Sequence, residues 1–320
     1  MVYKNGGVYV LKLWISPQDI GALEMTQLTI GLLGVGEMGA GLASAFVNAG
    51  HTVVSDLTGR SESSCVRALK AKIEGEVSLE AVVTRADILF SVLPTQFAYD
   101  EAARVSKLLK GIKTSLLFVE ANAIAPSLAA DISKLFTDDN TNFIDAGIVG
   151  APPSGSKRPR LYVSGGNVEP LKLLDGLGID LVDLGKKIGM ASAFKMTYAA
   201  MTKGVNALLT NVMLAAEEHG FLELFLQEVD QSQANLAQRA KANISRLPCD
   251  AARWEDEMKQ IARSFDDIGL PSSFHIGAGE IMQILAASPY GLETRLTYDE
   301  TRSMMATIQE ISSTWSGGND

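Results

Sequence analysis

The sequence predicts an α/β domain with a doubly wound parallel sheet, followed by an all-helical domain. Between Leu28 and about Gly185, short continuous apolar runs alternate with amphipathic stretches. Such runs between helices are typical of a parallel sheet that is covered on both faces. After Gly189 the pattern is helical throughout. We therefore expect residues 25–186 to form the α/β domain and residues 187–320 the helical domain.

Seven segments have the continuous apolar character of buried strands. In chain order they are residues 28–34, 51–55, 86–94, 115–121, 142–150, 160–166 and 179–185. A helix with regular apolar spacing follows the first strand and ends at Gly50, a typical helix-stop residue. Another helix begins near Pro126, after the fourth strand. This alternation is the pattern of consecutive βαβ units.

The helical domain begins with its longest segment. Residues 190–219 have small and apolar side chains without proline, enough for one helix of roughly 45 Å. Further helical patterns follow at 251–269 and 273–288. The long helix is apolar around much of its surface and needs cover on every side. We therefore expect a homodimer in which helical domains pack on each other, with the active site near the interdomain cleft.

Composition and charge exclude several classes of function. The chain has 320 residues, a net charge of −9 and a pI near 5.0. Binding to duplex nucleic acid needs a basic surface, and the one basic cluster, at residues 157–160, is too short to provide it. Cys65 and Cys249 have no disulfide-framework or metal-ligand spacing. We expect a small-molecule partner, and neither nucleic acid nor metal.

The N-terminal residues look unlike the rest of the chain. The apolar stretch at 8–15 is too short for a membrane span or a signal core, and it contains Lys12. We therefore expect a cytoplasmic protein that does not bind a membrane. Met25 stands three residues before the first strand. Residues 1–24 are interpreted as an extension of doubtful order, either an upstream addition or a weakly packed leader.

A glycine-rich turn joins the first predicted strand to the first helix. Its six residues fit the pattern G-x-G-x-x-G: Gly34, Val35, Gly36, Glu37, Met38 and Gly39. In this pattern the first glycine allows the tight turn, the second the approach of a pyrophosphate, and the third close packing of helix on strand. The helix N-terminus favours the anion. We therefore expect a Rossmann-type domain that binds NAD or NADP at this turn.

The end of the second predicted strand carries two opposing signals on the choice of cofactor. Asp56 stands where a carboxylate would bind the ribose 2′-hydroxyl and select NAD. Arg60 and Ser61 follow it, and an arginine beside a hydroxyl suits the 2′-phosphate of NADP. The alternative is that Arg60 is a solvated loop residue without a role in cofactor binding. We expect Arg60 and Ser61 to bind the cofactor, with NADP favoured and NAD as the alternative.

Five motifs in this order resemble those of the β-hydroxyacid dehydrogenases, the group that includes 3-hydroxyisobutyrate dehydrogenase and 6-phosphogluconate dehydrogenase. They are the glycine turn, SVLPT at 91–95, EANAIAP at 120–126, DAGIVGA at 145–151 and GMASAFK at 189–195. The resemblance covers residues 28 to about 310. It implies a homodimer and a helical domain similar to the C-terminal domain of 6-phosphogluconate dehydrogenase. The C-terminal half of the chain resembles a poorly characterised and divergent branch of the family.

The same resemblance implies site residues. Beyond the glycine turn, the cofactor contacts that it implies are Leu93, Pro94, Thr95 and Asn122. The substrate contacts that it implies are Ala146, Val149 and Gly150. The family's catalytic lysine falls on Lys195.

The chain departs from the family at positions that normally hold a hydroxy acid. The usual serine of the substrate loop falls on Val149, its second glycine on Ala151, and the usual asparagine after the lysine on Ala199. A small hydroxy acid held in the usual way is therefore in doubt. Tyr198 offers a phenolic hydroxyl in place of the asparagine, and a packed aromatic is the equal alternative.

Lys195 is the residue that carries the predicted chemistry. Its neighbours Ala191, Phe194 and Met196 make a poor environment for a solvated charge, and burial lowers the pKa of a lysine toward neutrality. Such a lysine can take a proton from a hydroxyl as hydride leaves, or return it. Lys203 has no role in the family and is interpreted as structural or peripheral. For Glu257 a role in the substrate cleft is left open.

We therefore predict an NAD(P)-dependent oxidoreductase that acts on a 3-hydroxy acid or a related hydroxyl or carbonyl compound, with Lys195 as general acid and base. Two alternatives remain. One is an imine reductase-like enzyme, although that group usually lacks the lysine. The other is a non-catalytic NAD(P)-binding sensor of redox state.

Overall fold

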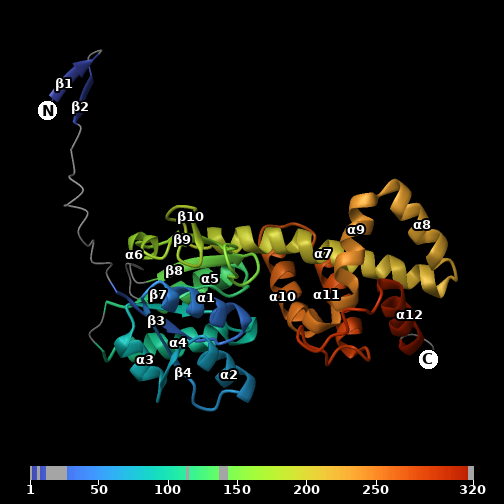
Figure 1. Ribbon diagram of the computed structural model, residues 1–320, viewed down its shortest axis with the longest axis horizontal. Helices are drawn as coiled ribbons and strands as arrows, with labels where there is room; N and C mark the ends of the chain where they lie inside the picture. The colour runs from blue at the N-terminus through green and yellow to red at the C-terminus, as the bar shows by residue number, and fades with distance from the viewer. Residues whose placement is uncertain (1, 6–7, 12–26, 113–114, 137–142, 316–320) are drawn as a thin grey trace.

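The computed structural model describes residues 2–5, 8–11, 27–112, 115–136 and 143–315 (Figure 1). Strands β1 (Val2–Asn5) and β2 (Val8–Leu11) pair antiparallel with each other. The interpretation of residues 1–24 as an extension falls mostly outside the described residues and stays a prediction.

The central element is an eight-stranded sheet with the strand order β10-β9-β8-β7-β6-β3-β4-β5. Its strands are β3 (Thr29–Leu32), β4 (Thr52–Asp56), β5 (Glu74–Glu76), β6 (Ile88–Ser91), β7 (Leu117–Glu120), β8 (Phe143–Val149), β9 (Arg160–Gly165) and β10 (Asp180–Asp183). All seven predicted strands are confirmed. The eighth, β5, is short and polar, and therefore lacks the apolar run on which the prediction depended.

One strand pair departs from the predicted parallel arrangement. β9 runs antiparallel to β8, whereas the other neighbouring pairs in this sheet are parallel. The connection between β8 and β9 is too short for a helical crossover, which parallel strands require. It begins at Gly150, whose φ of +129° suits a residue without a Cβ.

Helices cover both faces of the sheet, as a doubly wound fold requires (Figure 1). They are α1 (Glu37–Asn48), α2 (Glu62–Lys70), α3 (Leu79–Arg85), α4 (Ala98–Leu109), α5 (Pro126–Ser133) and α6 (Glu169–Lys172). Leu42 and Phe46 of α1 belong to the apolar core on one face. Val82 of α3 and Val105 of α4 belong to the core on the other face. The strand order reverses between β3 and β6, the switch point where such folds bind ligands.

The rest of the chain is helical in the described residues. It comprises α7 (Met190–Glu218), α8 (Leu222–Ser232), α9 (Ala234–Asn243), α10 (Pro248–Asp266), α11 (Ser273–Ala287) and α12 (Met304–Thr314). α7 is one continuous helix that packs on β8 and β9 and also on α10, α11 and α12 (Figure 1). The predicted domain boundary at residues 186–187 falls between β10 and α7. None of the described helices combines the length and apolar character that crossing a bilayer requires.

A single buried carboxylate attaches α7 to the sheet. Asp145 lies on β8 and is fully buried. Its Oδ2 accepts hydrogen bonds from the backbone N–H groups of Gly189, Ala191 and Ser192 at 3.0–3.1 Å, and from the Ser164 hydroxyl at 2.9 Å. Its Oδ1 accepts one from the Ser192 hydroxyl at 2.5 Å. The carboxylate therefore satisfies N–H groups that a helix start leaves unpaired, and its charge complements the helix dipole.

We predict that Asp145→Asn destabilises the protein strongly, because the asparagine amide presents N–H groups to donors that then have no acceptor. An unsatisfied buried donor costs about 1–3 kcal/mol, so the free energy of unfolding measured in urea should fall by at least about 3 kcal/mol. The matched control is Asp131→Asn, which removes an exposed ion pair with Lys134 and should cost less than about 1 kcal/mol. Equal effects of the two substitutions would contradict this account of α7.

Candidate functional site

The glycine turn between β3 and α1 is built by close backbone contacts. A Cβ on Gly34 would lie 2.0 Å from the Val92 carbonyl oxygen, and a Cβ on Gly39 would lie 2.0 Å from the Gly34 carbonyl oxygen. A side chain at either position is therefore excluded. At Gly36, nothing lies within 4 Å of the place of a Cβ. Two glycines thus close the turn, and the third leaves open space at the first turn of α1 for a phosphate to approach the backbone.

The predicted ribose-side residues lie together at the end of β4. The Asp56 Oδ1 atom accepts a hydrogen bond from the Thr58 N–H at 2.9 Å. Arg60 is exposed and donates from Nη2 to the Leu33 carbonyl at 2.9 Å. Ser61 caps α2 by accepting from the Ser64 N–H at 3.3 Å. Arg60 therefore reaches from this end of β4 back to the end of β3, beside the glycine turn.

Arg67 is a second arginine at the turn, and sequence reasoning missed it. It lies on α2, and its Nε donates to the Val35 carbonyl at 3.0 Å. On sequence alone, an arginine in this amphipathic helix is indistinguishable from a solvated one. The structure shows that it braces the backbone of the glycine turn.

The loops after β6 and β7 are tied to each other. Leu93 donates its N–H to Asn122 Oδ1, and Asn122 donates from Nδ2 to the Ser91 hydroxyl at 2.8 Å. Thr95 donates from its hydroxyl to the Ala123 carbonyl at 3.3 Å. The Asn122 side chain is buried and its amide is used within the protein. This arrangement favours a role in positioning the Leu93 loop over direct contact with a cofactor.

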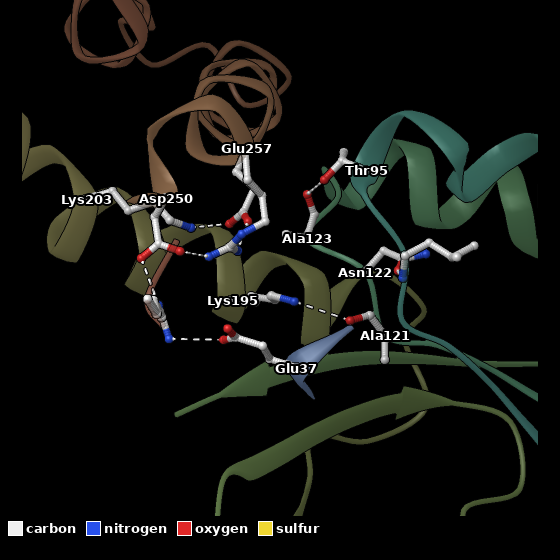
Figure 2. A network of polar contacts seen from close by, with 12 residues as sticks. Glu37, Thr95, Ala121, Asn122, Ala123, Lys195, Lys203, Asp250 and Glu257 are labelled. Carbon is white, nitrogen blue, oxygen red and sulfur yellow. Dashed lines mark hydrogen bonds and ion pairs between the residues drawn. The ribbon is translucent and has the colours of Figure 1, made fainter. Parts of the chain in front are cut away.

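Lys195 reaches from α7 toward the same loops. Its ammonium nitrogen lies 3.3 Å from the Ala121 carbonyl oxygen, directly after β7 (Figure 2). The pKa of Lys195 is lowered to about 8, mainly by burial and also by Lys203 and Arg253, while Glu257 and Glu120 oppose the change. A lysine with this pKa exchanges protons near neutral pH. The structure therefore places the ammonium group of Lys195 at the carboxyl edge of the sheet.

A chain of alternating charges extends from the neighbourhood of Lys195 to the glycine turn (Figure 2). Lys203 on α7 forms an ion pair with the buried Glu257 on α10. Arg253 donates to Glu257 at 2.5 Å and to Asp250 at 2.9 Å. Arg295 bonds to Asp250 at 2.7 Å and lies 3.5 Å from the Glu37 carboxylate in the glycine turn. The buried end of this electrostatic link between the helices and the glycine turn is the pair Lys203 and Glu257. The sequence analysis interpreted Lys203 as structural or peripheral and left a role for Glu257 open.

The predicted substrate residues lie on β8 and at its end. Ala146 is fully buried in the core of the sheet, Val149 is nearly buried, and Gly150 is exposed. Ala146 therefore has only its backbone to offer a ligand. Tyr198 is 40% exposed on α7 and lies outside the charged chain. Direct contact of these four residues with a substrate stays a prediction. Among the described residues, no group of His, Cys, Asp and Glu side chains has the arrangement of a metal site.

Comparisons with known proteins agree with this geometry. Residues 29–176 match the family described as the NAD binding domain of 6-phosphogluconate dehydrogenase. Residues 216–285 match a domain of unknown function, DUF1932. The first match contains the glycine turn and the strands around it, and the second contains helix α10, which carries Arg253 and Glu257.

Individual relatives point the same way. An uncharacterized 28.5 kDa protein of Methanothermus fervidus is 28% identical over 206 residues, which cover 64% of this chain and 78% of the relative. Mitochondrial 3-hydroxyisobutyrate dehydrogenase of Drosophila melanogaster is 27% identical over 197 residues, covering 61% of this chain and 56% of the enzyme. The match thus spans little more than half the length of that enzyme.

Solved structures share the fold. A conserved protein of unknown function, described as structurally similar to 3-hydroxyacid dehydrogenases, is 28% identical with a TM-score of 0.59, covering 81% of this chain and 97% of its own. Mycobacterium tuberculosis 3-hydroxyisobutyrate dehydrogenase with L-serine has a TM-score of 0.63 at 17% identity, covering 88% and 98% of the two chains. The glycine turn, the fold and these relatives support a member of the β-hydroxyacid dehydrogenase family with a divergent C-terminal domain.

Proposed function

We propose that this protein is an NAD(P)-dependent oxidoreductase that interconverts a hydroxyl and a carbonyl group on a 3-hydroxy acid or a related compound. The observation that carries the proposal is the position of Lys195. Its ammonium group lies at the carboxyl edge of the sheet, beside the loops that follow β6 and β7, and its pKa is lowered to about 8. General acids and bases are most effective when their pKa lies near the operating pH.

In this proposal the glycine turn binds the cofactor, and Lys195 transfers the proton. The open space at Gly36 and the start of α1 suit a pyrophosphate. A bound nicotinamide supplies the chemistry of accepting or giving a hydride. In oxidation, Lys195 acts as an amine and takes the proton from the substrate hydroxyl. In reduction, Lys195 acts as an ammonium ion and gives a proton to the carbonyl oxygen.

The charges around Lys195 support an anionic substrate. Cations outnumber carboxylates along the charged chain when Lys195 is protonated: the cations are Lys195, Lys203, Arg253 and Arg295, and the carboxylates are Glu37, Asp250 and Glu257. A substrate carboxylate would balance this excess. The balance is consistent with a hydroxy acid, although Val149 and Ala199 replace the polar groups that usually hold one.

The exposed face of α7 supports the homodimer as part of the proposal. Five large apolar side chains on α7 are 39–59% exposed: Met190, Phe194, Tyr198, Met201 and Leu208. Their spacing of three, four and seven residues places them on one side of the helix. A second copy of the chain would cover this stripe.

We predict that Lys195→Met abolishes proton transfer without unfolding the protein. Helix propensities of lysine and methionine are close, and the glycine turn lies on another element, so NADPH binding by fluorescence titration should be retained. The turnover number with a responsive hydroxy acid should fall by about 10²–10⁴-fold. The control is Lys187→Met, which removes an exposed lysine just before α7 and should leave turnover unchanged.

Near wild-type turnover in Lys195→Met would contradict the lysine mechanism and favour a reductase that takes its proton elsewhere. If the unmodified protein binds NADPH tightly but turns over no member of a broad panel of hydroxy acids, ketones and ketone–amine pairs, the sensor alternative replaces the enzyme.

We predict that Arg60→Ala selectively weakens the binding of NADPH. A hydrogen bond to a charged group contributes about 1.5–3 kcal/mol, so the affinity for NADPH should fall about 10- to 100-fold while that for NADH barely changes. Arg67→Ala is the matched control, because Arg67 braces the glycine turn and its loss should weaken both cofactors alike. If Arg60→Ala also weakens both cofactors equally, Arg60 only supports the turn and the preference for NADP is wrong.

We predict that the protein is a dimer in solution. Light scattering at micromolar concentration should give twice the chain mass of 34.2 kDa. Met201→Glu places a charge in the middle of the apolar stripe and should shift the mass toward the monomer. A wild-type mass of one chain would refute the proposed interface.

A further inference from the structure

Two buried carboxyl groups lie side by side where the sheet meets α7. Glu120 is the last residue of β7, and its register partner on β8 is Asp145. Both residues are fully buried. The partner of Glu120 on the opposite side, β6, is the uncharged Ser91. Two adjacent buried carboxyls cannot both be ionised without a large cost, so one of them keeps its proton.

Hydrogen bonding decides which carboxyl is ionised. Asp145 accepts five hydrogen bonds, three of them from the N–H groups at the start of α7. Glu120 accepts one through Oε1, from the Asn122 N–H at 3.0 Å. Within the described part of the chain, the buried Oε2 atom of Glu120 has no hydrogen-bond partner. Because an ionised oxygen without a donor is costly in a core, Asp145 holds the negative charge and Glu120 holds a proton.

Burial raises the pKa of both carboxyl groups, and at Asp145 the hydrogen bonds from Ser192, Ser164 and Gly189 oppose the rise. The pKa of Glu120 is raised to about 8, mainly by burial and also by the charge of Asp145, whereas Asn122 and Lys195 oppose the rise. Glu120 is therefore mainly a neutral acid at pH 7.

Glu120 is also the carboxyl group of the sheet whose charge acts on Lys195. Lys195 bonds to the carbonyl of Ala121, the next residue after Glu120. From the helical side, the charged groups that act on Lys195 are Glu257, Lys203 and Arg253. These three are held together by ion pairs. Glu120 is the member of this group whose charge changes near neutral pH.

We propose that Glu120 is a proton-carrying positioning residue that sets the charge of Lys195. While Glu120 is neutral, it does not hold Lys195 as an ammonium ion, and Lys195 can lose its proton. When Glu120 ionises, its negative charge favours the ammonium form. The two groups therefore titrate as a coupled pair. The use of this coupling in catalysis rests on the proposed function, but the coupling itself does not.

The first test is the infrared spectrum of the wild-type protein and of Glu120→Gln. Glutamine keeps the shape of the protonated acid and cannot ionise. At pH 7 the wild-type protein should show the carbonyl stretch of a protonated carboxyl group, and this band should fade as the pH rises through about 8. The band should be absent from Glu120→Gln. A wild-type spectrum without the band, or a band that persists in the variant, would overturn the proposal.

The second test measures the charge of Lys195 without any turnover. Trace acetylation followed by mass spectrometry gives the labelling rate of Lys195 against pH. Near pH 7, where Glu120 is neutral, Glu120→Gln should label like the wild type. Above about pH 8 Lys195 should label faster in Glu120→Gln, because no carboxylate then holds it as an ammonium ion, and each half-unit decrease in its pKa raises the rate about threefold. Glu310→Gln, a change at an exposed glutamate on α12, is the control and should leave the rate unchanged. An unchanged profile in Glu120→Gln would show that Glu120 does not set the charge of Lys195.

The third test uses protein stability. A carboxyl whose pKa rises from 4.5 in the unfolded chain to about 8 in the folded one binds more protons when folded. Its contribution is fully present below pH 4.5 and is lost as the pH rises to about 8. The wild type loses this contribution as the pH rises, and the glutamine variant has no such loss. The melting temperature of Glu120→Gln minus that of the wild type should therefore increase as the pH rises from 4.5 to about 8. A constant difference would contradict the protonated state, whether or not the protein is an enzyme.

Discussion

The carboxylate of Asp145 at the start of α7 is the interaction on which the rest of the site depends. It joins a strand of the sheet to a helix that continues into the helical core. The helix can lie this close because Gly147 has no side chain: a Cβ there would lie 2.8 Å from the Ala191 carbonyl oxygen and 2.9 Å from the Lys195 Cβ. These two constraints fix the first turns of α7 over the carboxyl edge of the sheet. They therefore also fix the position of Lys195, which lies on the second turn of α7.

Once α7 is fixed, the charge of Lys195 is controlled from two sides. On the helical side, Glu257 stays ionised despite its burial, because Lys203 and Arg253 lower its pKa. On the sheet side, Glu120 remains neutral near pH 7 because Asp145 already holds the charge. The same ion pairs continue through Asp250 and Arg295 to Glu37 in the glycine turn. The cofactor turn and the environment of the lysine are therefore linked by electrostatics as well as by the fold.

The sequence predicted the parts of this arrangement that depend on local pattern. Apolar runs located seven strands. Gly50 marked the end of one helix and Pro126 the beginning of another, and the spacing of the glycines located the turn. Lys195 was identified from its place in the GMASAFK motif. The antiparallel direction of β9 was missed because an apolar run does not reveal strand direction, and β5 was missed because it is short and polar. The pairing of Lys203 with Glu257, the bracing by Arg67 and the proton on Glu120 were missed because each depends on residues far apart in the chain. Substrate contacts by Tyr198, Ala146, Val149 and Gly150 remain predictions.

The central claim is that the fold gives Lys195 an abnormally low pKa. Its most direct test is NMR titration of the side-chain carbons in protein labelled with carbon-13 lysine, with the Lys195 signal assigned by its loss in Lys195→Met. The account predicts one lysine that titrates near pH 8, well below the ordinary value of 10.5. A Lys195 signal that titrates with the other lysines near 10.5 would contradict the account.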